Sequence, residues 1–233
     1  MASRKATARI AGGLYLAYIV LTVVANAARD RLVVAGDAAT TAANVVASAP
    51  LFRLSFVSDV LAGVLFLVTA WALYVLLKPV KPDVALLFVL LNLAGVAVQC
   101  LNMLNFFAAG VILGVADAPG AIAEGGSPAL AMLFLELHRN GFMIAQFFFG
   151  AWLLPLGYLV LRSGFLPRLL GVVLIVESAA WLTYALQFFL LPEATGVASV
   201  SSVIGFIGEF SLMLWLLIVG AREPAPAPAP APA

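Results

Sequence analysis

Charged residues are scarce in this 233-residue chain, and cysteine and histidine are scarcer still. Only 10% of the residues are Asp, Glu, Lys or Arg, and 64% are hydrophobic. A soluble domain carries about 25% charged residues, so this chain has too few charges to cover a surface that faces water. The composition therefore predicts a polytopic membrane protein whose surroundings are a lipid bilayer.

The same shortages exclude several kinds of chemistry. A single cysteine, Cys100, cannot form an internal disulfide. A net charge of +1 leaves no basic patch for nucleic acid. A zinc site needs three or four Cys, His or carboxylate ligands, so the single histidine, His138, would have to recruit distant carboxylates. We therefore expect no metal site and no cofactor.

Long apolar runs are what the chain has in abundance. A helix needs about 20 mostly apolar residues to cross a hydrocarbon core roughly 30 Å thick. Runs of this kind are separated by Pro, Gly and charged residues, which favour turns. They cover residues 9–28, 54–77, 84–111, 141–161, 168–191 and 200–221. The sequence predicts an all-α bundle of six transmembrane helices within one membrane domain, residues 1–222.

The first run has an alternative interpretation. It follows basic residues and ends in Ala25-Asn26-Ala27, which has the small-x-small form of a signal-peptidase site. Cleavage there would leave five helices. The apolar stretch over residues 10–28 is longer than the roughly 7–15 residues of a signal-peptide core, which favours an uncleaved helix.

Lys and Arg are distributed unevenly between the two sides of the predicted bundle, and cytoplasmic loops carry the excess of these residues. The side with the N-terminus has eight of them: Arg4, Lys5, Arg9, Lys78, Lys81, Arg162, Arg168 and Arg222. The other side has four: Arg29, Arg31, Arg53 and Arg139. We therefore expect both termini to be cytoplasmic.

Two segments outside the predicted spans have patterns of their own. In the outer loop, Asp37 precedes an Ala-rich stretch and Pro50 follows it, which predicts a short interfacial helix over residues 37–49. The chain ends in a strict Pro-Ala alternation, which has no side chains to build a core and predicts a disordered tail over residues 223–233.

Polar residues inside the spans are concentrated between the midplane and the outer face of the membrane. At 1.5 Å per helical residue, Glu177 lies about 14 Å above Arg168 and Glu209 about 20 Å above Arg222, close to the midplane. Further polar residues reach the outer boundary: Asp59, Asn102, Glu136, His138 and Arg139. Charge inside a bilayer is costly and usually faces a bundle interior or a cavity.

This distribution predicts a pocket open to the outside. Its floor would be Glu177 and Glu209, and its rim Asp59, Asn102, Glu136 and Arg139. If the two floor carboxyls approach each other, they would share a proton. The alternative is that each polar group only hydrogen-bonds a neighbouring helix, which we favour for Asn102 but not for the two glutamates.

These observations favour a non-enzymatic membrane protein that binds or transports a small or lipid-like molecule, with no catalytic residue assigned. One alternative is a membrane enzyme acting on a lipid or isoprenoid, with Glu136 and His138 as acid and base. Another is an accessory subunit that scaffolds a second membrane protein. The sequence does not fix the oligomeric state.

Several motifs lie along the chain's length: Arg9-x-Ala11-Gly12-x-x-Tyr15, Gly36-Asp37-Ala38-Ala39-x-Thr41-Ala42-Ala43-Asn44, Leu51-Phe52-Arg53, Leu135-x-Leu137-His138-x-x-Gly141-Phe142, Gly157-Tyr158-Leu159-x-x-Arg162-Ser163-Gly164-Phe165-Leu166-Pro167-Arg168-x-Leu170-Gly171 and Gly208-Glu209-x-x-Leu212-x-Leu214-Trp215. They resemble the bacterial domain of unknown function 4386 family, and the most specific of them is the Arg-Ser-Gly-aromatic-Leu-Pro turn over residues 162–167. The resemblance implies a multi-pass protein of the bacterial inner (plasma) membrane. It implies no activity, substrate or cofactor.

Overall fold

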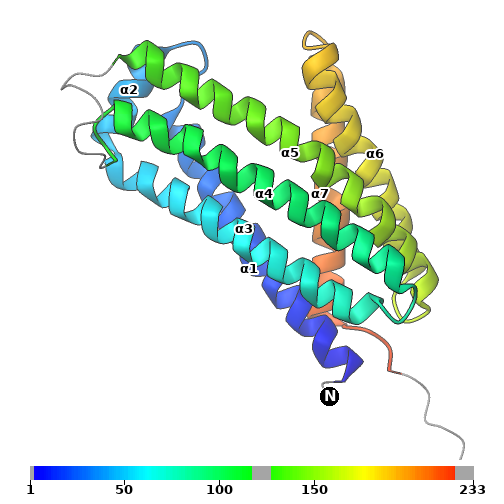
Figure 1. Ribbon diagram of the computed structural model, residues 1–233. Helices are drawn as coiled ribbons and strands as arrows, with labels where there is room; N and C mark the ends of the chain where they lie inside the picture. The colour runs from blue at the N-terminus through cyan, green and yellow to red at the C-terminus, as the bar shows by residue number, and fades with distance from the viewer. Residues whose placement is uncertain (1–2, 117–126, 224–233) are drawn as a thin grey trace, which may run out of the picture.

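The structure, a computed structural model, describes residues 3–116 and 127–223. In these residues every regular element is an α-helix, as Figure 1 shows. The helices are α1 (Arg4–Leu32), α2 (Ala38–Ala47), α3 (Ala49–Leu77), α4 (Pro82–Ile112), α5 (Pro128–Ser163), α6 (Arg168–Leu190) and α7 (Thr195–Ile218). All but α2 are long and apolar enough to cross a membrane. The predicted all-α fold with six membrane-spanning helices is confirmed, and the predicted tail beyond Glu223 lies outside the described residues.

Several helices extend beyond their apolar runs because polar residues cap them. The side chain of Ser3 accepts a hydrogen bond from the backbone N–H of Ala6, so α1 begins at Arg4 rather than near residue 9. Ser127 caps α5 in the same way, which lengthens this helix to 36 residues. The apolar runs therefore predicted the membrane-spanning part of each helix, but not the residues at which the helix begins and ends.

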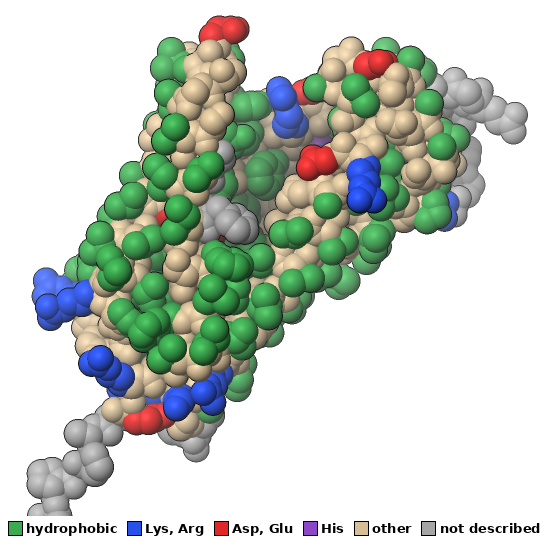
Figure 2. All heavy atoms as spheres, turned by 180° about the vertical axis from the view of Figure 1, so that it is seen from behind, with side chains coloured by type: hydrophobic (Ala, Val, Ile, Leu, Met, Phe, Trp, Pro, Cys, Tyr) green, Lys and Arg blue, Asp and Glu red, His purple; other side chains and the backbone are tan. Residues whose placement is uncertain are grey.

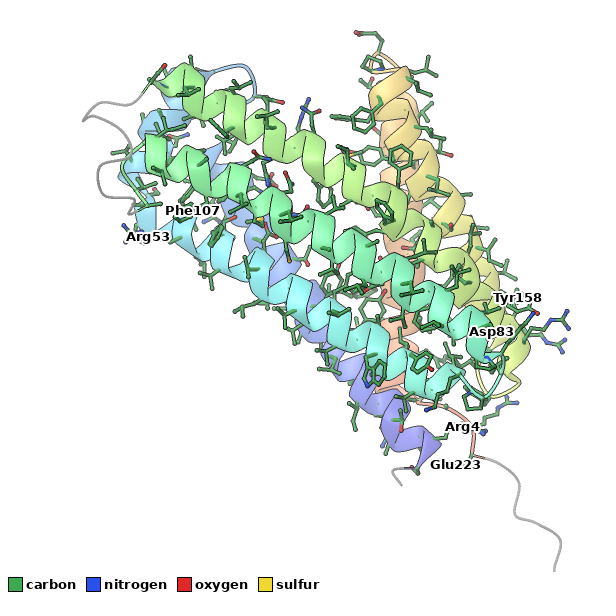
Figure 3. The ribbon with its side chains drawn as sticks, in the orientation of Figure 1. Arg4, Arg53, Asp83, Phe107, Tyr158 and Glu223 are labelled. Carbon is green, nitrogen blue, oxygen red and sulfur yellow. The ribbon has the colours of Figure 1, made fainter. Side chains whose placement is uncertain are left out.

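The bundle has two ends, which are named here by what they hold. The terminal end holds both described chain ends, and Arg4, Tyr158, Asp83 and Glu223 lie there in Figure 3. The two chain ends are joined at this end, because the backbone N–H of Lys5 donates to Glu223 at 2.8 Å. That hydrogen bond lowers the pKa of the Glu223 carboxyl. The loop end is the opposite one, which holds α2.

The helices form two groups that spread apart toward the loop end. Helices α1, α3, α4 and α5 lie side by side, whereas α6 and α7 form a hairpin that stands at an angle to them (Figure 1). Along the chain of contacts, α1 packs on α3, α3 on α4, α4 on α5, α5 on α6, α6 on α7 and α7 on α1. The spanning helices therefore form a closed ring of neighbours.

The buried core divides in a way that explains this shape. The larger cluster of buried apolar residues takes members from all six spanning helices, including Tyr15 of α1, Trp152 of α5 and Leu212 of α7. A second cluster at the loop end includes Leu32, Phe106 and other residues of α1 to α5. Among the described residues it has no member from α6 or α7. The hairpin therefore has no buried core to hold it against the other helices at the loop end.

The short helix α2 is fixed locally by its own sequence. The Asp37 carboxylate accepts hydrogen bonds from the backbone N–H and the hydroxyl of Thr40, and these bonds lower its pKa. The helix ends at Ala47, two residues before the predicted end. Pro50 does not terminate it, because this proline lies in the first turn of α3, where the missing N–H is tolerated. Helix α2 packs on α5 and helps to cover the loop end.

Close packing of α1 on α7 depends on one glycine. A Cβ atom on Gly12 would lie 2.5 Å from the backbone nitrogen of Leu217, whereas a Cβ on the next residue, Gly13, would meet nothing within 4 Å. The two helix backbones therefore approach each other at Gly12, and no side chain fits between them.

We expect Gly12→Ala to lower the free energy of unfolding by about 1–3 kcal/mol, because an added methyl forces the two backbones apart. Gly13→Ala is the matched control and should leave stability unchanged or slightly higher. Thermal unfolding in detergent, followed by tryptophan fluorescence, measures both. Equal stability of the two variants would contradict the close α1–α7 contact.

Candidate ligand-binding crevice

The space between the two groups of helices contains a cavity of about 400 Å³. Its walls come from α1, α3, α5, α6 and α7, and Figure 2 shows the hollowed face between the α6–α7 hairpin and the remaining helices. The position follows from the fold, since this is where the hairpin leaves the other helices. We call this space the crevice.

Aromatic side chains make up much of the wall of the crevice. The rings of Tyr18 and Phe66 are stacked, with their centroids 4.1 Å apart and their planes at 6°. The aromatic residues that line the crevice are Tyr18, Phe66, Phe142, Phe149, Trp181 and Phe210. Polar side chains interrupt this wall, among them Asn26, Gln146 and Glu209. A wall of this composition suits a molecule that is mostly apolar and has one polar group.

A second hollow of about 280 Å³ adjoins the crevice toward the loop end. Asn26, Asp30 and Phe142 line both spaces, so the two are neighbours. The second hollow is also lined by Glu136, His138 and Arg139. We call it the vestibule.

Glu209 is the predicted site residue that lies in the wall of the crevice. The hydroxyl of Tyr15 donates a hydrogen bond to its carboxylate, which ties α1 to α7 at this depth. Tyr15 is fully buried, whereas Glu209 is half-buried and lines the open space. The carboxylate therefore has one fixed partner and remains accessible from the crevice.

Glu177 is next to the crevice but does not line it. Its side chain is fully buried against Gly208, where any larger residue would collide with the carboxyl group. Among the described residues neither of its oxygens has a hydrogen-bond partner. The indole N–H of Trp181 and the backbone N–H of Glu209 lie near this carboxyl group, but neither has the geometry of a hydrogen bond to it.

Asp59 and Asn102, which were predicted for the rim, line neither space. Asp59 pairs with Arg29, and Arg29 also donates to the Oδ1 atom of Asn26 at 2.7 Å. The Asn102 amide donates to the backbone carbonyl of His138 at 2.8 Å. Both side chains join neighbouring helices, since depth along a helix does not say which way a side chain faces.

Glu136 and Arg139 do line the vestibule, and they form an ion pair with 3.1 Å between Nε and the carboxylate. The guanidinium of Arg139 also lies over the ring of Phe188 at 5.2 Å, which connects α5 to α6 near the opening. Both members of this pair are substantially exposed. Within the residues described here, no group of three or more His, Cys, Asp or Glu could hold a metal ion.

The sequence prediction missed the contribution of α1 to the crevice. Tyr15, Tyr18, Thr22, Asn26 and Asp30 follow one another at spacings of three or four residues, which places them along one face of the helix. Four of them line the crevice and Tyr15 lies behind Glu209. The signal was present in the spacing, but Tyr and Thr are also common where they only pack between helices.

The fold defines a multi-pass integral membrane protein, with a largely aromatic cavity between two groups of helices. The family model described as a domain of unknown function (DUF4386) matches residues 10–220, so the chain belongs to this family. The resemblance found in the sequence is thereby confirmed.

One curated relative extends the likeness to the archaea. An uncharacterized protein of Archaeoglobus fulgidus is 24% identical over 168 residues, which cover 72% of this chain and 85% of that protein. No solved structure matches.

The ion pair between Arg29 and Asp59, beside the vestibule, can be tested by substitution. Its side chains are only 17% and 9% exposed. Asp59→Asn would leave a poorly solvated guanidinium without its counter-charge and should lower the free energy of unfolding by about 2–4 kcal/mol.

The matched control is Asp30→Asn, which removes an exposed carboxylate that has no ion pair among the described residues. It should change stability by less than about 0.5 kcal/mol. Replacing both partners, as Arg29→Met with Asp59→Leu, should recover most of the loss. Chemical unfolding in mixed micelles measures all three variants, and a harmless Asp59→Asn would refute the pairing.

Proposed function

We propose that this protein binds or transports a small or lipid-like amphiphilic molecule in the crevice. The observation that carries the proposal is the cavity of about 400 Å³ whose largely aromatic wall includes the carboxyl group of Glu209. Pockets for small molecules commonly measure about 300–1,000 Å³ and combine apolar walls with a few placed polar groups. The crevice has both properties.

Access from the membrane is supported by the wall itself. Val23 of α1 and Phe210 of α7 line the crevice, yet they are 52% and 39% exposed. Both side chains are therefore exposed beside the crevice, on a surface that the bilayer would cover. A molecule with a long apolar part could enter there without passing through water.

The orientation we propose has both termini in the cytoplasm. Eight of the twelve Lys and Arg residues belong to the terminal end, and cytoplasmic loops carry this excess. The vestibule then opens to the outside, and the site is accessible from that face. The family resemblance supports the bacterial inner membrane as the location.

The alternative of an enzyme draws less support from the geometry. Glu136, its proposed acid or base, is paired with Arg139, and the Nδ1 atom of His138 lies 3.2 Å from the amide nitrogen of Asn102. These contacts occupy both side chains with structural partners. An accessory subunit that scaffolds a second membrane protein would need no cavity, so this alternative gives the crevice no function.

Native mass spectrometry of the protein released gently from its own membrane tests the proposal. We expect a retained mass that differs from bulk lipid, and we expect Thr22→Trp to remove it by filling the crevice from α1. Val20→Trp is the matched control, because Val20 is on the same helix, is 50% exposed and does not line the crevice. A wild-type protein that carries nothing, and that binds no added amphiphile, would overturn the proposal.

A further inference from the structure

The charges around the crevice are unbalanced. Among the residues that line it, Glu209 and Asp30 are acidic and none is Lys or Arg. Asp30 is exposed and belongs to no ion pair in the described part of the chain. Glu177 lies against Gly208, next to the wall residue Glu209, so any charge on it adds to the same sign.

The two arginines of the vestibule do not offset this imbalance. Arg29 is paired with Asp59, and Arg139 with Glu136. Each pair is close to neutral when seen from a distance, because its two charges cancel. The uncompensated charges that face the opening are therefore negative.

The aromatic wall favours the same kind of ligand. An aromatic face attracts a cation within about 6 Å of its centre, and groups of such faces recognise quaternary ammonium ions. Tyr18 of α1 and Trp181 of α6 line the crevice and are partly exposed, whereas Phe66 of α3 is buried and stacked on Tyr18.

Resting on the proposed function, we infer that the crevice selects a lipophilic organic cation, such as a quaternary ammonium or phosphonium ion. Its charge would lie beside Glu209 and its apolar groups against the aromatic rings. The cation replaces no existing contact, since the hydrogen bond from Tyr15 uses one side of the carboxylate and the crevice gives access to another. Asp30 would attract the ligand at the entrance.

Two probes of nearly the same shape and opposite charge separate the possibilities. Tetraphenylphosphonium and tetraphenylborate are added to the full-length protein in phosphatidylcholine nanodiscs, and binding is measured by equilibrium dialysis. Empty nanodiscs correct for partitioning into lipid. We expect saturable binding of the phosphonium and at least about tenfold weaker binding of the borate, because the probe charge changes sign beside a carboxylate.

Three variants test which residues bind the phosphonium ion. Glu209→Gln should weaken phosphonium binding by about tenfold or more while keeping an acceptor for Tyr15, so that the fold is retained. Asp30→Asn should weaken it by a smaller factor. Glu193→Gln, which changes an exposed carboxylate in the turn between α6 and α7, is the matched control and should have no effect.

The outcomes distinguish this inference from the proposed function. Equal binding of both probes, abolished for both by Thr22→Trp, would overturn the cation selectivity and leave amphiphile binding standing. Phosphonium binding that survives in Glu209→Gln and in Asp30→Asn would also overturn the selectivity, because the carboxylates would have no part in it. Absence of binding of both probes and of any retained molecule would overturn the inference and the proposed function together.

Discussion

The architecture depends on where α6 and α7 are packed against the other helices. Near the terminal end, glycines allow backbones to approach: Gly12 of α1 faces α7, and Gly157 of α5 faces Gly171 of α6. Toward the loop end the buried cluster is built from α1 to α5, and the hairpin diverges from it. A bundle packed tightly at one end and only partly at the other leaves a crevice as a consequence of its geometry.

The polar residues of the bundle are divided by the same geometry. Where helices are in close contact, polar groups are paired across the contact, as Arg29 is with Asp59 and Asn102 with His138. Where the helices separate, Asp30 faces open space, and Glu209 lines the crevice although it also accepts a hydrogen bond from Tyr15 of α1. Glu177 fits neither description, because it is fully buried and its oxygens have no hydrogen-bond partner among the described residues. Burying a polar group in this way costs free energy, which sets Glu177 apart from groups that only stabilise the bundle.

Much of the fold could be predicted from the sequence because a bilayer imposes one length and one composition on every span. The six spans follow from the long apolar runs that this length requires. The direction of a side chain does not follow, because it depends on which helix is adjacent. Depth counting could therefore not separate Glu209, which lines the crevice, from Asp59, which pairs with α1. The divergence of the α6–α7 hairpin could not be predicted either, since it results from the sum of many contacts.

The central claim is that the crevice is an open, water-accessible space reached from the outer face, and cysteine accessibility tests it most directly. In a Cys100→Ser background, Thr22→Cys places a thiol in the crevice and Val20→Cys places one on the lipid-facing side of the same helix. A charged, membrane-impermeant thiol reagent is added to the outer face of cells. The account predicts modification of the cysteine at position 22 and not of the cysteine at position 20. An unreactive cysteine at position 22, or one that reacts only from the cytoplasmic face, would contradict it.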